Sequence, residues 1–135
     1  MKRFLLIVSL ISFSILTNAQ NVQQSGPPNA GSFYVTITTA KGQERMNVNY
    51  TLLPAIFTTD LTLRMDCWES MLLSAKIFNS KNEAVLSWMP ALAAKMYSHQ
   101  FDISNLRPGN YKLDIYGPAG NKVQSVNFQK QASSN

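Results

Sequence analysis

Few residues in this chain have the chemistry that a catalytic centre needs. His99 is the only histidine and Cys67 is the only cysteine, which excludes a histidine-rich metal site. A serine–histidine–aspartate arrangement would have to use His99, and the sequence contains no Gly-x-Ser-x-Gly motif. We therefore expect no catalytic residues and no enzymatic activity. His99 stands beside Gln100 at the start of an expected strand, so we expect an exposed or locally bonded histidine.

Three acidic residues, Asp60, Asp66 and Glu69, lie close together in the sequence. Paired carboxylates hydrolyse glycosides only when a cleft holds them at a defined separation. Calcium-binding loops use the pattern Asp-x-Asp-x-Asp-Gly, which is absent. Arg64 falls beside Asp66 on the polar face of one expected strand, so a surface ion pair is the simpler explanation. The sequence predicts no metal site and no cofactor, and a small hydrolase built on these acids is the least favoured alternative.

The residues best suited to binding a ligand are Trp68, Arg64 and Trp88. Trp68 falls on the strand face opposite the apolar one, with Arg64 on the same side, and Trp88 ends another expected strand. Exposed aromatic side chains stack on sugar rings or anchor protein partners. A core or corner position is nevertheless the preferred interpretation for both tryptophans. Cys67 shares its face with apolar residues, which predicts a small buried hydrophobe.

Short segments in which apolar and polar residues alternate fill the chain from residue 33 to residue 130, separated by turn residues. This period of two is typical of half-buried β-strands. The expected strands are 33–38, 46–52, 61–68, 72–78, 84–88, 99–103, 111–116 and 123–128. Residues 89–98 are less regular and are expected to form a loop or one helical turn. The fold class predicted from this pattern is all-β: a single immunoglobulin-like antiparallel β-sandwich of about seven or eight strands.

The N-terminus carries the pattern of a secretory signal peptide. Lys2 and Arg3 precede the apolar run 4–16, and Thr-Asn-Ala follows. The run is shorter than the roughly 20 residues that a membrane-spanning helix needs. We expect cleavage after residue 19, a flexible leader over 20–32, a sandwich over 33–130 and a tail over 131–135. The mature chain holds no other candidate transmembrane segment, so the sequence predicts an exported protein of the periplasm, cell surface or medium.

The charge and the cysteine content limit the classes of partner and the ways in which the domain can be stabilised. The whole chain has a formal net charge of +5, and cleavage would remove Lys2 and Arg3. The remaining basic residues are scattered and no two are adjacent, whereas nucleic-acid surfaces cluster them on one face. We expect no nucleic-acid partner. With one cysteine, no disulfide forms within the chain, so packing alone stabilises the domain. Free strand edges in such a sandwich can pair with another chain.

The most specific pattern lies within residues 102–116. Leu106 ends one expected strand, Pro108 and Gly109 form a turn, and Tyr111 opens the next strand. Proline presets φ for the turn and glycine can supply a positive φ. Tyr111 is then placed to form a hydrogen bond back across the corner, as in the tyrosine corner of immunoglobulin-like sandwiches. We expect these four residues to form a structural corner, with a plain Pro-Gly hairpin as the alternative.

The sequences SAKIFNSKNEAV and FDISNLRPGNYKLDIYGPAGNKVQSVNFQK resemble the C-terminal sorting domain of the bacterial type IX secretion system. The matching positions are 75–78, 79–82, 84–86, 102–106, Gly109, Tyr111 and 126–130. The resemblance implies an immunoglobulin-like sandwich exported by a member of the Bacteroidetes, similar also to the small stand-alone secreted sandwiches of that phylum. We expect no cargo domain before the segment, and no Pro-Asn-Pro motif opens it. We therefore expect a stand-alone binding or structural module of the cell envelope, whose partner is a cell-surface protein or a glycan. The alternative is a carbohydrate-binding accessory protein.

Overall fold

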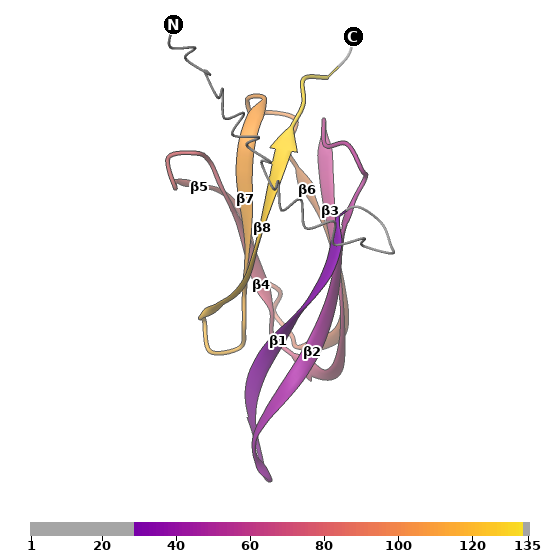
Figure 1. Cartoon of the computed structure of the whole chain (residues 1–135), viewed down its shortest axis with the longest axis vertical. Helices are drawn as coiled ribbons and strands as arrows, with labels where there is room; N and C mark the ends of the chain where they lie inside the picture. Colours follow the sequence, from indigo (N-terminus) through magenta and orange to yellow (C-terminus); the bar gives the residue numbers. More distant parts are fainter. Residues whose placement is uncertain (1–28, 134–135) are drawn as a thin grey trace, which may run out of the picture.

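Two four-stranded antiparallel sheets pack face to face in the computed structural model, which describes residues 29–133 (Figure 1). Sheet A has the order β1-β2-β3-β6 and sheet B the order β5-β4-β7-β8. The strands are β1 (Ala30–Thr39), β2 (Gly42–Leu53), β3 (Asp60–Met71), β4 (Ser74–Phe78), β5 (Ala84–Trp88), β6 (Ala94–Asp102), β7 (Gly109–Tyr116) and β8 (Lys122–Lys130). The all-β class predicted from the sequence is confirmed, and no helix occurs among the described residues.

Alternating side chains build the core between the two sheets. In β3, Leu61, Leu63 and Met65 are buried, while Arg64 and Asp66 point to solvent from the other face. Successive side chains of a strand point to opposite faces of the sheet, so the sequence pattern becomes one apolar and one polar surface. Burying a large apolar side chain contributes roughly 1.5–3 kcal/mol. The outer face of sheet A is therefore the polar side of β3, on which the candidate residues Arg64 and Trp68 were expected.

The first strand begins at Ala30 rather than at Phe33, so the last residues of the expected leader belong to the sheet. Gly31 pairs with Tyr50 in β2, and a Cβ atom at position 31 would lie 2.7 Å from the Tyr50 hydroxyl oxygen. The start of the strand, residues 30–32, therefore forms without a large side chain of its own, because the tyrosine ring covers the glycine. The expected signal peptide (1–19) and the start of the leader lie outside the described residues.

The expected loop or helical turn over 89–98 is wrong for its second half, because β6 begins at Ala94 rather than at His99. The Tyr97 hydroxyl accepts a hydrogen bond from the Ala94 backbone nitrogen at 2.7 Å. It also lies 2.8 Å from the Met71 carbonyl oxygen and 2.9 Å from that of Leu92. A single side chain thus ties the segment to the end of β3, and that contact is not visible in the local sequence.

A bulge interrupts the pairing of β3 with β6. Asp66 pairs with Met96 and Met71 pairs with Ala94, so residues 67–70 of β3 lie opposite Lys95 alone. Extra residues in one strand leave the ladder, bend the strand and redirect its side chains. Trp68 belongs to this bulged segment. The β3 strand consequently extends to Met71, beyond the end that alternation predicted.

The corner between β6 and β7 has the expected hydrogen bond. The Tyr111 hydroxyl donates to the Arg107 carbonyl oxygen at 2.6 Å. Gly109 has a φ of 151°, and Leu106 packs against the core. The Tyr111 ring stacks on Phe128 of β8, with ring centroids 5.8 Å apart. Tyr111 therefore ties the corner to the strand next to it in sheet B.

Candidate functional site

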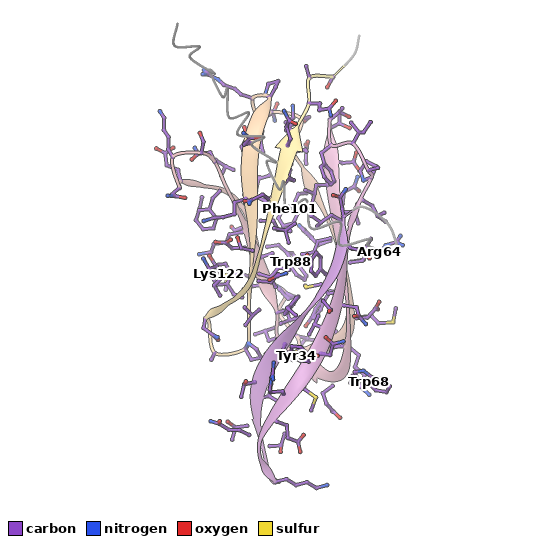
Figure 2. All side chains as sticks on the ribbon, viewed as in Figure 1. Tyr34, Arg64, Trp68, Trp88, Phe101 and Lys122 are labelled. Carbon is purple, nitrogen blue, oxygen red and sulfur yellow. The ribbon has the colours of Figure 1, made fainter. Side chains whose placement is uncertain are left out.

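The two tryptophans occupy different environments. The Trp68 side chain is 77% exposed and projects from the outer face of sheet A, whereas Trp88 lies between the sheets (Figure 2). Trp88 is half-buried and packs edge-on against Tyr97, with ring centroids 5.3 Å apart. The preferred core interpretation was therefore wrong for Trp68. It describes Trp88, which the structure separates from the face that carries Trp68 and Arg64.

His99 belongs to the packing around Trp88. Its ring stacks on Trp88 at 5.1 Å with an interplanar angle of 17°, and meets Phe101 edge-on at 4.6 Å. The expectation of an exposed or locally bonded histidine at a strand start was wrong, because β6 begins earlier and His99 points inward from its middle. Burial lowers the pKa of His99. Neutral imidazole therefore fits its aromatic neighbours, and the half-buried ring packs between Trp88 and the core residue Phe101.

Four large, exposed hydrophobic side chains come from the β3 bulge, from β6 and from the β5–β6 connection. We call Trp68, Met89, Leu92 and Met96 the Trp68 patch; each is between 76% and 79% exposed. Met96 pairs with Asp66 at one end of the bulge, and Leu92 is tied through Tyr97 to Met71 at its other end. Met89 opens the same connection between β5 and β6. The patch residues therefore come from the bulge and from segments that meet its two ends.

The backbone that carries the patch is held in place. The Tyr97 hydroxyl contacts backbone groups on both sides of the β5–β6 connection, at Leu92 and at Ala94. The Tyr97 ring is itself fixed against Trp88. Exposed hydrophobic side chains are normal one at a time, but a group of them marks an interaction surface. Here four such side chains are exposed, and Tyr97 holds the backbone at Leu92.

An open pocket of about 380 Å³ lies beside Trp68, lined also by Asn49, Asp66, Cys67 and Lys95. Burial and the nearby Asp66 carboxylate raise the pKa of the Cys67 thiol. The protonated thiol is a poor nucleophile, so this half-buried cysteine serves as pocket wall. Asn49, Asp66 and Lys95 add hydrogen-bonding groups next to the indole ring.

The charged residues of this face do not pair as expected. Arg64 and Asp66 both point outward from β3, yet across residues 29–133 the one salt bridge joins Lys112 to Asp114 on sheet B. The surface ion pair expected of Asp66 is therefore not formed. Further along the same face, the Arg45 guanidinium lies 4.3 Å above the ring of Tyr34, which is 57% exposed. Charged groups thus border the Trp68 patch on its polar side.

A second open pocket, of about 530 Å³, lies over sheet B and is lined mainly by amide side chains. The Asn79 side chain there already accepts hydrogen bonds from the backbone nitrogens of Lys81 and Glu83, both at 3.0 Å. It therefore shapes the β4–β5 turn. None of the pocket's residues is an exposed large hydrophobic side chain. The Trp68 patch has the stronger features of a binding site.

Met89, Leu92 and Met96 were missed by the sequence reasoning, although the uncharged apolar run at 89–94 was a visible signal. Its lack of alternation concealed which side chains would be exposed. Neither a family model nor a curated protein matches the chain. Within residues 29–133, no group of three or more His, Cys, Asp or Glu side chains is placed to hold a metal ion. The same part of the chain contains no helix long and apolar enough to cross a membrane.

Proposed function

We propose that this protein is an exported, non-enzymatic module of the bacterial cell envelope that binds another protein through the Trp68 patch. The observation that carries the proposal is that each of the four patch residues is at least 76% exposed. The Tyr97 hydroxyl holds the backbone of the β5–β6 connection by hydrogen bonds at Leu92 and Ala94. Large exposed apolar groups lose hydration when a partner covers them, which makes such a surface favourable for association.

The composition of the patch favours a protein partner. Tryptophan is enriched among the residues that dominate binding energy, and methionine adapts its flexible thioether to irregular partner surfaces. The charged side chains of Asp66 and Lys95 line the same open pocket as Trp68. An apolar centre with a polar rim is the usual anatomy of a protein interface.

The strand order supports an immunoglobulin-like framework for this module. In that framework, one sheet has the order first, second, fifth and fourth strand, and the other has the order third, sixth and seventh. The sheet segments β2-β3-β6 and β4-β7-β8 follow these orders without a counterpart of the fourth strand among the described residues, and β5 is added beside β4 and β1 beside β2. The Tyr111 hydrogen bond lies at the start of β7, where the tyrosine corner is expected. We propose that the resemblance of these segments to type IX sorting domains reflects a shared immunoglobulin-like fold.

Export is supported by the N-terminal pattern of two basic residues, an apolar run and small residues. A module without an intrachain disulfide must hold its shape through its core. The buried cluster that spans both sheets supports that requirement. The Trp68 patch would then be presented in the envelope by a rigid sandwich.

Site-specific photo-cross-linking tests the proposal. A photoreactive phenylalanine analogue at Met96, introduced in the producing cells, should yield a discrete adduct with one partner protein. The adduct should disappear when Trp68→Ala is added, because the partner loses its anchor. The matched control carries the analogue at Asn127, which is exposed on sheet B. Adducts of equal yield at both positions would rule out this binding surface. So would an adduct at Met96 whose yield does not change when Trp68→Ala is added.

A glycan is the second candidate ligand, because the pocket beside Trp68 combines an indole ring with Asn49, Asp66 and Lys95. Sugar-binding sites pair an aromatic platform with a few placed polar groups. In a Trp88→Phe background, Trp68 is the only tryptophan. Titration with envelope oligosaccharides should then change its fluorescence, and Asn49→Ala should weaken the response. A flat titration across the series would leave the protein partner as the sole candidate.

A further inference from the structure

β1 forms one edge of sheet A and differs from the other strand edges of the molecule. It pairs with β2 through an unbroken register from Ala30↔Thr51 to Thr39↔Gly42, with no bulge. Within residues 29–133, no strand pairs with its other side. A free edge presents unpaired backbone N–H and C=O groups to any strand of matching length.

The other three edges carry the features that protect an edge from pairing. β5 has five residues, β8 begins with the exposed Lys122 and is bridged at its end by Phe57, and β6 contains Lys95 and Asp102. Short length and charged side chains are the means by which sheet proteins block unwanted pairing. β1 spans ten residues and contains neither a charged residue nor proline. Among the edges that the structure describes, β1 alone is long, regular and uncharged.

The composition of β1 adds a positive preference for strand pairing. The segment FYVTITT over residues 33–39 consists entirely of aromatic and β-branched residues, which favour strands. Uncharged segments of this kind readily pair when left exposed. An envelope protein with such an edge gains from covering it with a specific partner.

We infer that β1 pairs antiparallel with β1 of a second copy about a two-fold axis. The two copies of sheet A then form one continuous sheet with the order β6-β3-β2-β1-β1-β2-β3-β6. A two-fold interface brings the same surface of each copy together, so that surface must not repel itself. β1 meets this condition because it has no charge. On the outer face, Arg45 lies one strand back on β2, over its own Tyr34.

This interface is independent of the proposed binding function. The Trp68 patch follows β3, β6 and the β5–β6 connection, whereas β1 is at the opposite edge of sheet A (Figure 1). A dimer through β1 therefore leaves both Trp68 patches open. Two patches held by one dimer raise the effective concentration of the second patch once a partner with two matching sites has bound the first.

Sedimentation analysis of the protein purified from the producing cells tests the inference. The wild-type protein should have twice the monomer mass in the micromolar range. Thr36→Lys places like charges close together at the two-fold interface and should weaken the dimer by about tenfold or more. Thr36 is exposed on the outer face but pairs with Arg45 of β2. Like charges directly opposite each other destabilise a strand pair, so the thermal midpoint of the separated Thr36→Lys monomer should fall somewhat. Thr38→Lys, at another exposed position of β1, faces the uncharged Gln43 and should weaken the dimer while leaving the thermal midpoint of the monomer nearly unchanged.

Two controls assign the interface. Ser98→Lys places the same charge at an exposed position of β6, the other edge of sheet A, and should leave the dimer intact. Trp68→Ala should also leave it intact, which separates this inference from the proposed function. Deuterium exchange of residues 32–38 should slow as protein concentration rises. A wild-type monomer throughout the micromolar range, or a dimer lost with Ser98→Lys but not with Thr36→Lys, would overturn the inference.

Discussion

At the scale of single residues, the Tyr111 hydroxyl and the His99 imidazole each make contacts whose contribution to stability can be measured. The Tyr111 hydroxyl donates to the Arg107 carbonyl oxygen across the corner at 2.6 Å. We expect Tyr111→Phe to lower the free energy of unfolding by about 0.5–1.5 kcal/mol, since a hydrogen bond to a backbone oxygen is lost. Urea denaturation measures the change. Tyr34→Phe is the matched control, because the exposed Tyr34 side chain should alter stability by less than about 0.5 kcal/mol. Equal effects of the two variants would show that the corner contributes nothing specific.

The lowered pKa of His99 makes stability depend on pH. Burial favours neutral imidazole in the folded state, so its pKa falls below the ordinary value of 6.5. The unfolded chain then binds the proton first, and stability should fall as the pH drops below about 6.5 and level off below the folded-state pKa. Thermal midpoints measured between about pH 8 and about pH 5 report this change.

His99→Phe is the control for this pH effect, because it keeps an aromatic ring against Trp88 and removes the titrating group. Its thermal midpoint should be flat over the same pH range. The Asp102 carboxyl affects stability in a separate, lower pH range. Hydrogen bonds from Ser104 lower the pKa of the Asp102 carboxyl below 3.8, so its contribution is lost only as the pH falls below about 3.8. A slope near neutral pH that persists in His99→Phe would contradict the assignment.

Sequence reasoning at this scale identified faces better than exposure. Alternation placed Trp68 opposite Leu63 and Met65, and the structure agrees. Alternation does not say whether a second layer covers the polar face, so Trp68 was expected to be packed. The expectation of an exposed His99 was wrong for another reason: histidine is a polar residue type, yet its ring packs against Trp88.

At the scale of elements, the strands were predictable and the contacts between distant ends were not. All eight expected strands occur, with clear alternation in β1 and in the first part of β3. The β3 bulge and the start of β6 instead depend on Tyr97 reaching across to Met71. The β1 start depends in the same way on Tyr50 covering Gly31. These partners lie far apart in the sequence, so no local pattern contains them.

The two tryptophans should separate cleanly in stability. Trp88 connects β5 of sheet B with β6 of sheet A through Tyr97 and His99. We expect Trp88→Ala to cost about 3–5 kcal/mol of unfolding free energy, because it leaves a cavity between the sheets. Trp68→Ala should change it by less than about 0.5 kcal/mol, as for other surface positions. Urea denaturation of both variants decides, and a large loss in Trp68→Ala would make Trp68 a structural residue.

Gly31→Ala should destabilise the start of β1. A methyl group at this position would lie 2.7 Å from the Tyr50 hydroxyl oxygen, and overpacking of this kind typically costs about 1–3 kcal/mol. A double-mutant cycle with Tyr50→Leu measures the coupling, since removing the ring should relieve most of the cost of Gly31→Ala. Additive effects of the two substitutions would refute the contact.

At the scale of the whole molecule, sheet A carries two surfaces of different kinds. The Trp68 patch consists of apolar side chains, whereas the β1 edge presents unpaired backbone N–H and C=O groups. They lie at opposite ends of the strand order β1-β2-β3-β6. The sequence predicted the two-layer class because apolar faces of sheets must be buried against each other. It could not predict the patch, which exists only where a bulge and a connection from the other sheet meet.

The most direct test of the central claim is the affinity of the cross-linked partner for the purified protein. Once the Met96 adduct has identified that partner, calorimetric titration compares the wild-type protein with Trp68→Ala. We expect the dissociation constant to rise by at least about tenfold, which corresponds to about 1.4 kcal/mol of lost binding, while the thermal midpoint stays unchanged. An unchanged dissociation constant in a folded Trp68→Ala protein would contradict the claim that this patch is the binding site.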